Sequence, residues 1–296
     1  MNAKSRKRAE LKYHVSRYGT GLLFMLPWMI GFILFVLIPV SWSLFMAFNK
    51  VQVGGTFKYE WVGLRNFRDA FLKDNIFPVE LITYFQQMLL MVPIIVLFAL
   101  LISLMLNQKF PGRFIFRALF FLPVIFATGQ VLSELFAQGV GDVPFLEQYN
   151  LEPLVKKYVG AQFTETVMDV LSRAVLILWY SGVQILIFIA GFQTIPASVY
   201  EAVRIDGATP WDSFWKITLP ASMPFISLNM LYTIIDLFTF PLNPVLAHIK
   251  DNMFKANTGY GYASALAWIY FAFIFILIAI VLGVFGRKMK RGSVRA

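Results

Sequence analysis

Side chains that could carry out catalysis are scarce in this sequence. It contains no cysteine, which excludes a disulfide, an iron–sulfur cluster and a thiol nucleophile. Its two histidines, His14 and His248, are far apart in the sequence, so a histidine-rich metal site is not available. No segment matches the phosphate-binding pattern GxxxxGK[ST], and no two carboxylates stand at catalytic spacing. The sequence therefore predicts a protein that is not an enzyme and has no catalytic residues, metal or cofactor of its own.

Acidic residues in two places could still bind a partner or a solute. The segment "EAVRIDGATPWDSFWKITLP", residues 201–220, carries Glu201 and Asp206, whose carboxylates can accept charge-assisted hydrogen bonds. Asp236 stands inside an apolar run, and a charge at the centre of a bilayer costs about 2.5–3.5 kcal/mol on insertion scales. We expect Asp236 either to face a central cavity or to pair with another subunit.

The composition places both features in a membrane protein. Of the 296 residues 58% are hydrophobic and 14% are charged, and the mean hydropathy is +0.68. A helix needs about 20 apolar residues to cross the hydrocarbon core, and it satisfies its own backbone groups there. We expect an all-α polytopic membrane protein with six spans: Gly21–Phe48, Ile82–Leu106, Phe114–Ala137, Val170–Gln193, Ala221–Pro241 and Ala263–Phe285.

The basic residues predict the orientation of these spans. A net charge of +10 could indicate nucleic-acid binding, but 16 of the 26 basic residues fall in four short segments, 1–20, 107–117, 195–219 and 287–296. All four lie on the same side if the N-terminus is inside, as the positive-inside rule requires. This predicts cytoplasmic basic tails at 1–20 and 287–296, one six-helix membrane domain at 21–286, and no nucleic-acid partner.

The remaining connections are predicted to lie outside. In the first, residues 49–81, "VGG" indicates a turn and "WVGLRNFRDAF" a short amphipathic helix along the membrane surface. The second is residues 138–169, and the third, residues 242–262, is expected to run as a loop to a "TGYGY" turn.

The charged inner loop has the local signals of two short helices. The first helix, 196–206, has proline in its first turn, and Gly207 suits the left-handed position after its end. Thr209 suits the N-cap of the second helix, with Asp212 three residues later, and Pro220 is expected to end it.

Two interpretations of this loop follow from the residues alone. It could be an amphipathic hairpin at the membrane surface, with its tryptophans at headgroup level and Lys216 near the phosphates. It could equally be a rigid docking element that presents Glu201 and Asp206 to a cytoplasmic partner. The residues do not separate these two interpretations.

The loop resembles the "EAA" loop of permease subunits of binding-protein-dependent ABC importers. Its pattern is Glu-Ala-Ala, then Asp-Gly-Ala, then Ile-x-Leu-Pro after about nine residues. Val203 replaces the second alanine, and the other positions of the pattern are in step: Glu201, Ala202, Asp206, Gly207, Ala208, Ile217, Leu219 and Pro220.

Flanking segments are similar to the carbohydrate, or multi-sugar, branch of this family. They include "QTIPASVYEAVRIDGATPWDSFWKITLPASMP", "LPWMIGFILFVLIPVSWSLFMAF", "WVGLRNF" and "GRFIFRALFFLPVI". The second outer loop departs from the branch because it lacks a Trp-rich segment after the third span.

The resemblance implies the fold of a type I ABC importer permease and a set of partners. These are a second, usually different, permease subunit, two ATPase subunits that carry ATP and Mg, and an extracytoplasmic binding protein that delivers a sugar or oligosaccharide. It also implies that the EAA loop sits in a cleft of the ATPase as a coupling lever. In that role Glu201 and Asp206 would make polar contacts, Gly207 would set the angle, and Ala202, Val203 and Ala208 would pack closely.

Polar and aromatic residues inside the spans are candidates for the solute path. Asp236 is accompanied in sequence by Asn229, Tyr232 and Asn243. Trp179, Tyr180 and Gln184 could stack on a sugar ring and hydrogen-bond to it, although aromatic residues in spans more often face lipid or pack. Glu134 lies close to the outer end of the third span, where exposure at the interface is the simpler interpretation.

Other function classes fit the sequence less well. An ion-coupled transporter would need a carboxylate relay or broken helices in both halves, and a membrane-embedded enzyme would need a nucleophile with a base or a metal cluster. Within the importer family the solute could be glycerol phosphate or a polyol. The expected location is the cytoplasmic membrane of a bacterium or an archaeon.

Overall fold

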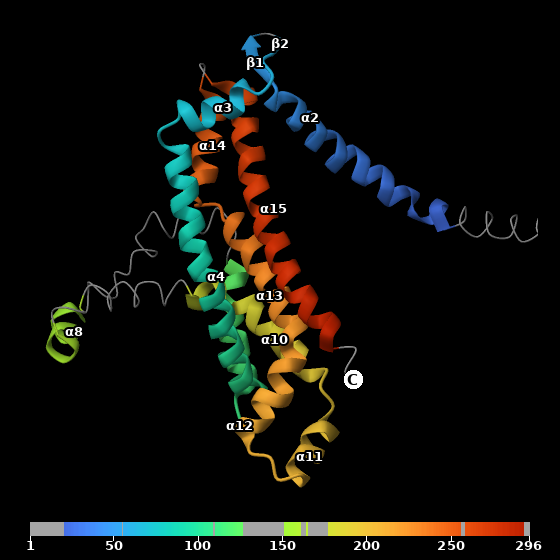
Figure 1. Cartoon of the computed structure of the whole chain (residues 1–296), viewed down its shortest axis with the longest axis vertical. Helices are drawn as coiled ribbons and strands as arrows, with labels where there is room; N and C mark the ends of the chain where they lie inside the picture. Colours follow the sequence, from blue (N-terminus) through green and yellow to red (C-terminus); the bar gives the residue numbers. More distant parts are fainter. Residues whose placement is uncertain are drawn as a thin grey trace, which may run out of the picture. The chain divides into compact units, whose positions relative to one another are not determined.

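The computed structural model describes residues 21–54, 56–108, 110–126, 151–160, 164, 177–255 and 258–292. The chain divides into two compact units. The first contains residues 1–75 and 249–269, and the second contains residues 76–248 and 270–296. Helices dominate both units (Figure 1).

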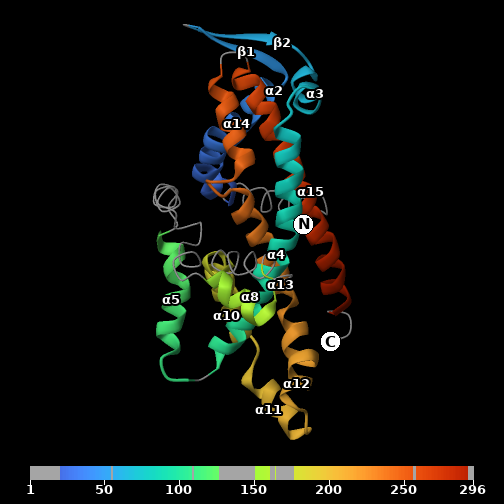
Figure 2. The ribbon, with the colours of Figure 1, turned by 90° about the vertical axis from the view of Figure 1, so that its left-hand side faces the viewer.

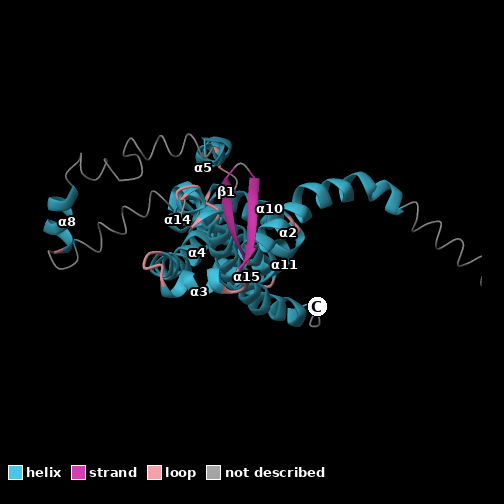
Figure 3. Ribbon diagram, turned by 90° about the horizontal axis from the view of Figure 1, so that it is seen from above, coloured by secondary structure: helices cyan, strands magenta, loops and turns pink. Residues whose placement is uncertain are grey.

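The first unit contains a β-hairpin that the all-α expectation missed. A helix runs from Gly21 through the π-helical turn η1 (Ile33–Leu37) and α2 (Ile38–Ala47). Strands β1 (Asn49–Gly54) and β2 (Thr56–Trp61) follow as an antiparallel pair, drawn in magenta in Figure 3. The signal was present in the sequence, because "NKVQVGGTFKYEW" alternates apolar and polar residues around a Gly-Gly turn.

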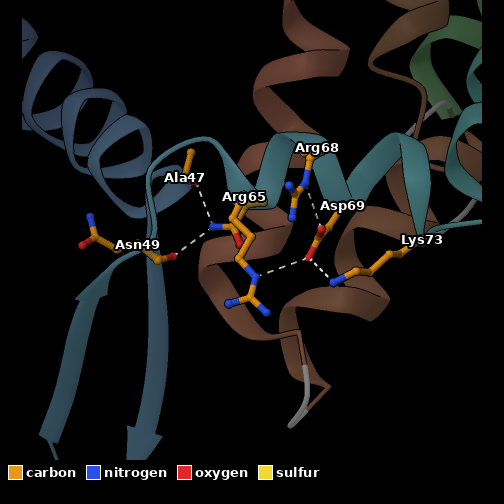
Figure 4. A network of polar contacts seen from close by, with 7 residues as sticks. Ala47, Asn49, Arg65, Arg68, Asp69 and Lys73 are labelled. Atoms are coloured by element: carbon orange, nitrogen blue, oxygen red, sulfur yellow. Dashed lines mark hydrogen bonds and ion pairs between the residues drawn. The ribbon is translucent and has the colours of Figure 1, made fainter.

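The expected short helix after the hairpin is confirmed as α3 (Arg65–Leu72). The Asn66 side-chain amide donates hydrogen bonds to the carbonyl oxygens of Ala47 (2.9 Å) and Asn49 (3.1 Å), so it joins α3 to both the end of α2 and the start of β1. Farther along α3, the Asp69 carboxylate lies 2.8 Å from the Lys73 ammonium (Figure 4).

The expected loop at residues 242–262 is wrong, because most of it is helix α14 (Pro244–Phe254). The Asn243 side-chain oxygen accepts a hydrogen bond from the Val245 N–H at 2.9 Å, which caps this helix just before a proline at its first position. The last long helix, α15 (Gly259–Gly292), begins within the expected "TGYGY" turn. A Cβ atom on Gly261 would lie 2.0 Å from the Asn49 carbonyl oxygen, so only glycine allows the first turn of α15 to pack on β1.

The second unit is built around three mutually packed helices, α4 (Phe77–Asn107), α10 (Gly182–Gln193) and α13 (Leu219–Phe238). Helix α5 (Arg113–Phe126) packs against α10, and α8 (Leu151–Val159) is the described part of the second predicted outer loop. The Phe225 ring fills the place where a side chain on Gly191 would lie, with ring atoms 2.5–2.8 Å from an added Cβ. Glycine on α10 therefore allows close contact with α13.

Two predicted inner loops lie at the same end of this unit. Figures 1 and 2 show α11 (Ala197–Ile205) and α12 (Pro210–Ser213) near the point where α4 ends and α5 begins. The turn between α4 and α5 is fastened by Arg117, whose guanidinium donates a 2.8 Å hydrogen bond to the Leu106 carbonyl oxygen. Both connections therefore lie at one end of the helix bundle.

Four helices in the described residues are long and apolar enough to cross a membrane: Gly21–Ala47, Phe77–Asn107, Pro210–Phe238 and Gly259–Phe285. They overlap the first, second, fifth and sixth predicted spans. A fifth candidate is the pair α10 and α11, which is bent by 65° at a short break. Residues 127–137 of the third predicted span, with Glu134, and residues 170–176 of the fourth lie outside the described residues.

Candidate functional site

The first helix of the charged loop ends in a complete Schellman motif. The Gly207 N–H donates to the Arg204 carbonyl oxygen and the Ala208 N–H donates to that of Val203, each at 3.1 Å. Gly207 has φ +76°, the left-handed conformation that favours glycine. The predicted helix end at Gly207 is therefore confirmed, and the motif gives Val203 and Ala208 their half-buried positions beside it.

The second helix begins with the capping box that the sequence predicts. The Asp212 N–H donates to the Thr209 hydroxyl at 3.2 Å, and the Thr209 N–H donates back to the Asp212 carboxylate at 3.4 Å. One turn later, the Lys216 ammonium donates to the same carboxylate at 2.7 Å. The hydrogen bonds from Lys216 and Thr209 hold the pKa of Asp212, which stands before the predicted span 221–241, at about 2.

The expectation that Pro220 ends this helix is wrong. Helix α12 passes through the π-helical turn η2 (Phe214–Thr218) into α13, so the chain is helical from Pro210 to Phe238. The Leu219 N–H donates to the Phe214 carbonyl oxygen five residues back. This wider turn accommodates a proline that has no N–H and would crowd the carbonyl oxygen of an ordinary α-turn. The same arrangement precedes Pro39 in α2, where the Ile38 N–H donates to Ile33.

A contact that sequence reasoning missed joins the two helices of the loop. The hydroxyl oxygens of Tyr200 on α11 and Thr218 on η2 lie 3.0 Å apart. Thr218 is 7% exposed, and its carbonyl oxygen accepts a 2.6 Å hydrogen bond from Ser222. Neither residue belongs to the EAA pattern, and their separation of 18 residues leaves no local signal.

The surface of the loop combines exposed charge with exposed apolar side chains. Glu201, Ala202 and Asp206 are exposed, and neither carboxylate has a hydrogen bond or ion pair with another described residue. Ile205 is 87% exposed and Trp211 is 69% exposed. The other pattern residues Ile217 and Leu219 are half-buried, and Pro220 is exposed. The two helices of the loop are therefore held together by hydrogen bonds, and the exposed surface of the loop carries both acidic and apolar side chains.

Three of the candidate solute-path residues are buried inside the second unit. Gln184 on α10 donates a 3.0 Å hydrogen bond to the Thr233 hydroxyl on α13, and both side chains are fully buried. Asn229, one turn before Thr233, is 0% exposed, and neither polar atom of its side chain has a partner among the described residues. Asn243 is 1% exposed.

Asn243 belongs to a polar network at the end of α13. Its amide donates to the Tyr270 hydroxyl (2.6 Å) and to the Phe238 carbonyl oxygen (3.2 Å), while Tyr270 donates to the same carbonyl at 2.7 Å. The Tyr84 hydroxyl on α4 donates to the Leu237 carbonyl oxygen at 2.6 Å. The contacts to Phe238 satisfy a carbonyl group at the helix end, and the Leu237 carbonyl accepts from the Phe240 N–H as well as from Tyr84. Sequence reasoning named neither Tyr84 nor Tyr270.

The other candidates are partly exposed, and one of them, Tyr180, lines a small cavity. Asp236, Tyr232, Tyr180 and Trp179 are all half-buried. A cavity of about 150 Å³ is lined by Tyr180 and Asn243 together with Tyr84, Gln87, Met88, Met91, Leu237, Phe240 and Leu242. Tyr180 packs edge-on against Phe240, with 5.3 Å between ring centroids. Asp236 is the one carboxylate of α13, one helical turn after Tyr232. Within the described part of the chain no group of three or more His, Cys, Asp and Glu residues could hold a metal ion.

Comparisons with known proteins agree with this arrangement. Residues 70–291 match the family described as "Binding-protein-dependent transport system inner membrane component". The probable ABC transporter permease protein YesP of Bacillus subtilis is 31% identical over 223 residues, which cover 74% of this chain and 70% of YesP. The multiple sugar-binding transport system permease protein MsmF of Streptococcus mutans is 30% identical, with 70% of each chain covered.

The fold is also shared with a solved structure. A chain of a bacterial ABC transporter involved in the import of the acidic polysaccharide alginate matches with a TM-score of 0.60 and 20% identity. The match covers 94% of this chain and 99% of that one. The chain therefore belongs to the family of inner membrane components of binding-protein-dependent transport systems, the permease subunits of ABC importers, and its part is transport and not catalysis.

Proposed function

We propose that this chain is the permease subunit of an importer that moves a sugar or oligosaccharide into the cytoplasm, driven by ATP that separate ATPase subunits hydrolyse. The solute class is supported by the multiple sugar-binding system to which MsmF belongs and by the alginate importer whose fold the chain shares. A binding protein outside the membrane delivers the solute, and a second permease subunit completes the pathway.

Residues 195–220 are the coupling loop of this importer. The observation that carries this assignment is the two-helix frame closed by Tyr200 and Thr218. It leaves the carboxylates of Glu201 and Asp206 exposed and without a partner among the described residues. A coupling loop must transmit displacement without bending, which the joined helices allow. The two carboxylates can accept hydrogen bonds from donors on a partner protein. Ile205, which is 87% exposed, supplies the apolar contact that a protein partner would bury.

The solute path is lined by the partly exposed residues Asp236, Tyr232, Tyr180 and Trp179. Gln184, Asn229 and Asn243 support this path from inside the helix bundle, because their burial keeps them from direct contact with a solute in this conformation.

The chain crosses the membrane six times, with both termini in the cytoplasm. The four long apolar helices support four of these spans, and residues 114–137 and 170–193 supply the other two. Residues 21–286 form the permease domain, and residues 1–20 and 287–296 are the cytoplasmic tails. The membrane is the cytoplasmic membrane of a bacterium or an archaeon.

Transport by the complete complex tests this proposal. The chain is reconstituted into liposomes with its second permease, its ATPase subunits and its binding protein, and uptake of labelled oligosaccharides is measured with and without ATP. We expect ATP-dependent uptake that is lost with Glu201→Lys or Gly207→Pro. Uptake that is abolished by an ionophore instead, or that is specific for glycerol phosphate or a polyol, would contradict the proposed energy source or solute.

A further inference from the structure

The β-hairpin of the first unit has one aromatic face and one charged face. Phe57, Tyr59 and Trp61 alternate along β2 with Lys58 and Glu60, so the two sets point to opposite sides of the hairpin. On β1, Val51 pairs with Tyr59 and Lys50 pairs with Glu60, which continues the same separation. Phe57 and Trp61 remain 57% and 68% exposed. The described residues therefore leave much of the aromatic face uncovered.

The aromatic face lies level with the last turns of the first membrane span. The Tyr59 ring is 5.9 Å from the Trp42 ring and 5.7 Å from the Phe45 ring, measured between centroids. Trp42 stands five residues before the end of α2 at Ala47, which is about 7.5 Å along a helix that rises 1.5 Å per residue. The hairpin therefore folds back beside the helix end and does not stand clear of it.

This surface continues the exposed apolar surface of the first predicted span. The apolar window of the helix Gly21–Ala47 is 0% buried by the described residues. Trp42 and Phe45 are themselves 51% and 43% exposed. Next in the chain, Leu64 at the N-cap of helix α3 and Leu72 at its end are exposed near basic residues. Trp and Tyr prefer the depth of the lipid headgroups, and lysine side chains reach outward from it.

From this continuity we propose that the hairpin 49–61 is an interfacial anchor that lies in the bilayer surface at the C-terminal end of the first span. Its occupant is phospholipid: Phe57, Tyr59 and Trp61 face the acyl boundary, while Lys50, Lys58 and Glu60 face headgroups and water. This inference is independent of the solute that the importer carries.

The chain has no cysteine, which makes site-directed spin labelling direct. Single cysteines at Phe57, Lys58, Tyr59 and Glu60 are labelled in the assembled transporter in phospholipid nanodiscs, and collision with oxygen and with a water-soluble nickel chelate is measured. Phe24→Cys in the first helix and Tyr158→Cys on α8 calibrate lipid and water, since Phe24 is 81% exposed and Tyr158 is 77% exposed. Trp61→Cys replaces Tyr59→Cys if the latter disturbs assembly.

We expect the ratio of oxygen to nickel collisions to alternate, severalfold higher at Phe57 and Tyr59 than at Lys58 and Glu60. Equal access of nickel to all four positions would place the hairpin in water and overturn the proposal. Protection of Phe57 and Tyr59 from both reagents would identify a protein partner, such as the second permease or the binding protein, as the occupant and would also overturn it.

Discussion

The hydroxyl groups of Tyr200 and Thr218 lie 3.0 Å apart and close the charged loop into a frame of two helices. Between them the chain makes a Schellman end at Gly207 and a capping box at Thr209, both of which depend on local hydrogen bonds. The Tyr200 contact restrains the angle between the helices, because it joins them at a distance from the turn that connects them.

Removing this bridge should uncouple ATP hydrolysis from transport. In Tyr200→Phe the ring stays and one hydrogen bond is lost, which costs about 0.5–1.5 kcal/mol. We expect the complex to assemble and the stimulation of its ATPase by loaded binding protein to fall severalfold. Tyr158→Phe is the matched control, since Tyr158 is 77% exposed on α8. Unchanged stimulation in Tyr200→Phe would show that the bridge plays no part in coupling.

Gly207 should tolerate asparagine better than alanine. Its φ of +76° costs an alanine roughly 1–2 kcal/mol, whereas asparagine adopts this conformation more readily. We expect transport in the order glycine, asparagine, alanine. Gly112, with φ +82° in the turn before α5, controls for backbone strain alone. If Gly112→Ala lowers coupled ATPase activity as much as Gly207→Ala does at equal melting temperature, the special role of Gly207 is wrong.

Gly191→Ala should lower the stability of the permease. An added Cβ would lie 2.5 Å from the Phe225 ring, and overpacking of this kind costs about 1–3 kcal/mol. Thermal unfolding in detergent should show a lower midpoint, and Phe225→Leu in the same chain should restore part of it. Gly283→Ala is the control, because nothing lies within 4 Å of a Cβ there. A Gly191→Ala midpoint equal to that of the control would contradict the packing.

Asp236→Asn should lower transport, whereas Asn243→Leu should lower stability. Asp236 is partly exposed and lies one helical turn after Tyr232, so we expect its change to reduce transport while the melting temperature stays near that of the parent chain. Asn243 caps α14 and bonds to Tyr270, so its loss leaves buried polar groups unpaired and should lower the melting temperature. The opposite pattern would reverse the assignment of solute path and support.

Local chemistry explains which elements could be predicted from the sequence. The end of α11 at Gly207 and the capping box at Thr209 depend on residues within one turn, and both were predicted. The hairpin and α14 also carry local signals, the Gly-Gly turn and Asn243 before Pro244. The connections that contain them are long and polar enough to be predicted as loops, and that prediction is wrong. Their helical and strand residues are stabilised by contacts such as Gly261 on Asn49, which lie far apart in the sequence.

The rest depends on three-dimensional contacts. No pattern in the sequence pairs Tyr200 with Thr218, or places Tyr84 and Tyr270 on the carbonyl groups that end α13. Apolar periodicity likewise cannot tell that Gln184 faces Thr233 and not a cavity. The EAA pattern locates the loop in the sequence. The structure identifies Tyr200 and Thr218 as the residues that join its two helices.

Cross-linking from Ile205 tests the coupling role of the loop most directly. Ile205 is 87% exposed on α11, so a photoreactive amino acid there should not disturb the frame. In the assembled transporter in nanodiscs we expect the probe at Ile205 to form a cross-link with the ATPase subunit. The same probe at Tyr158 should form no cross-link with that subunit. A cross-link from Ile205 to lipid, with the ATPase bound but unlabelled, would show instead that the loop is a surface hairpin in the membrane interface.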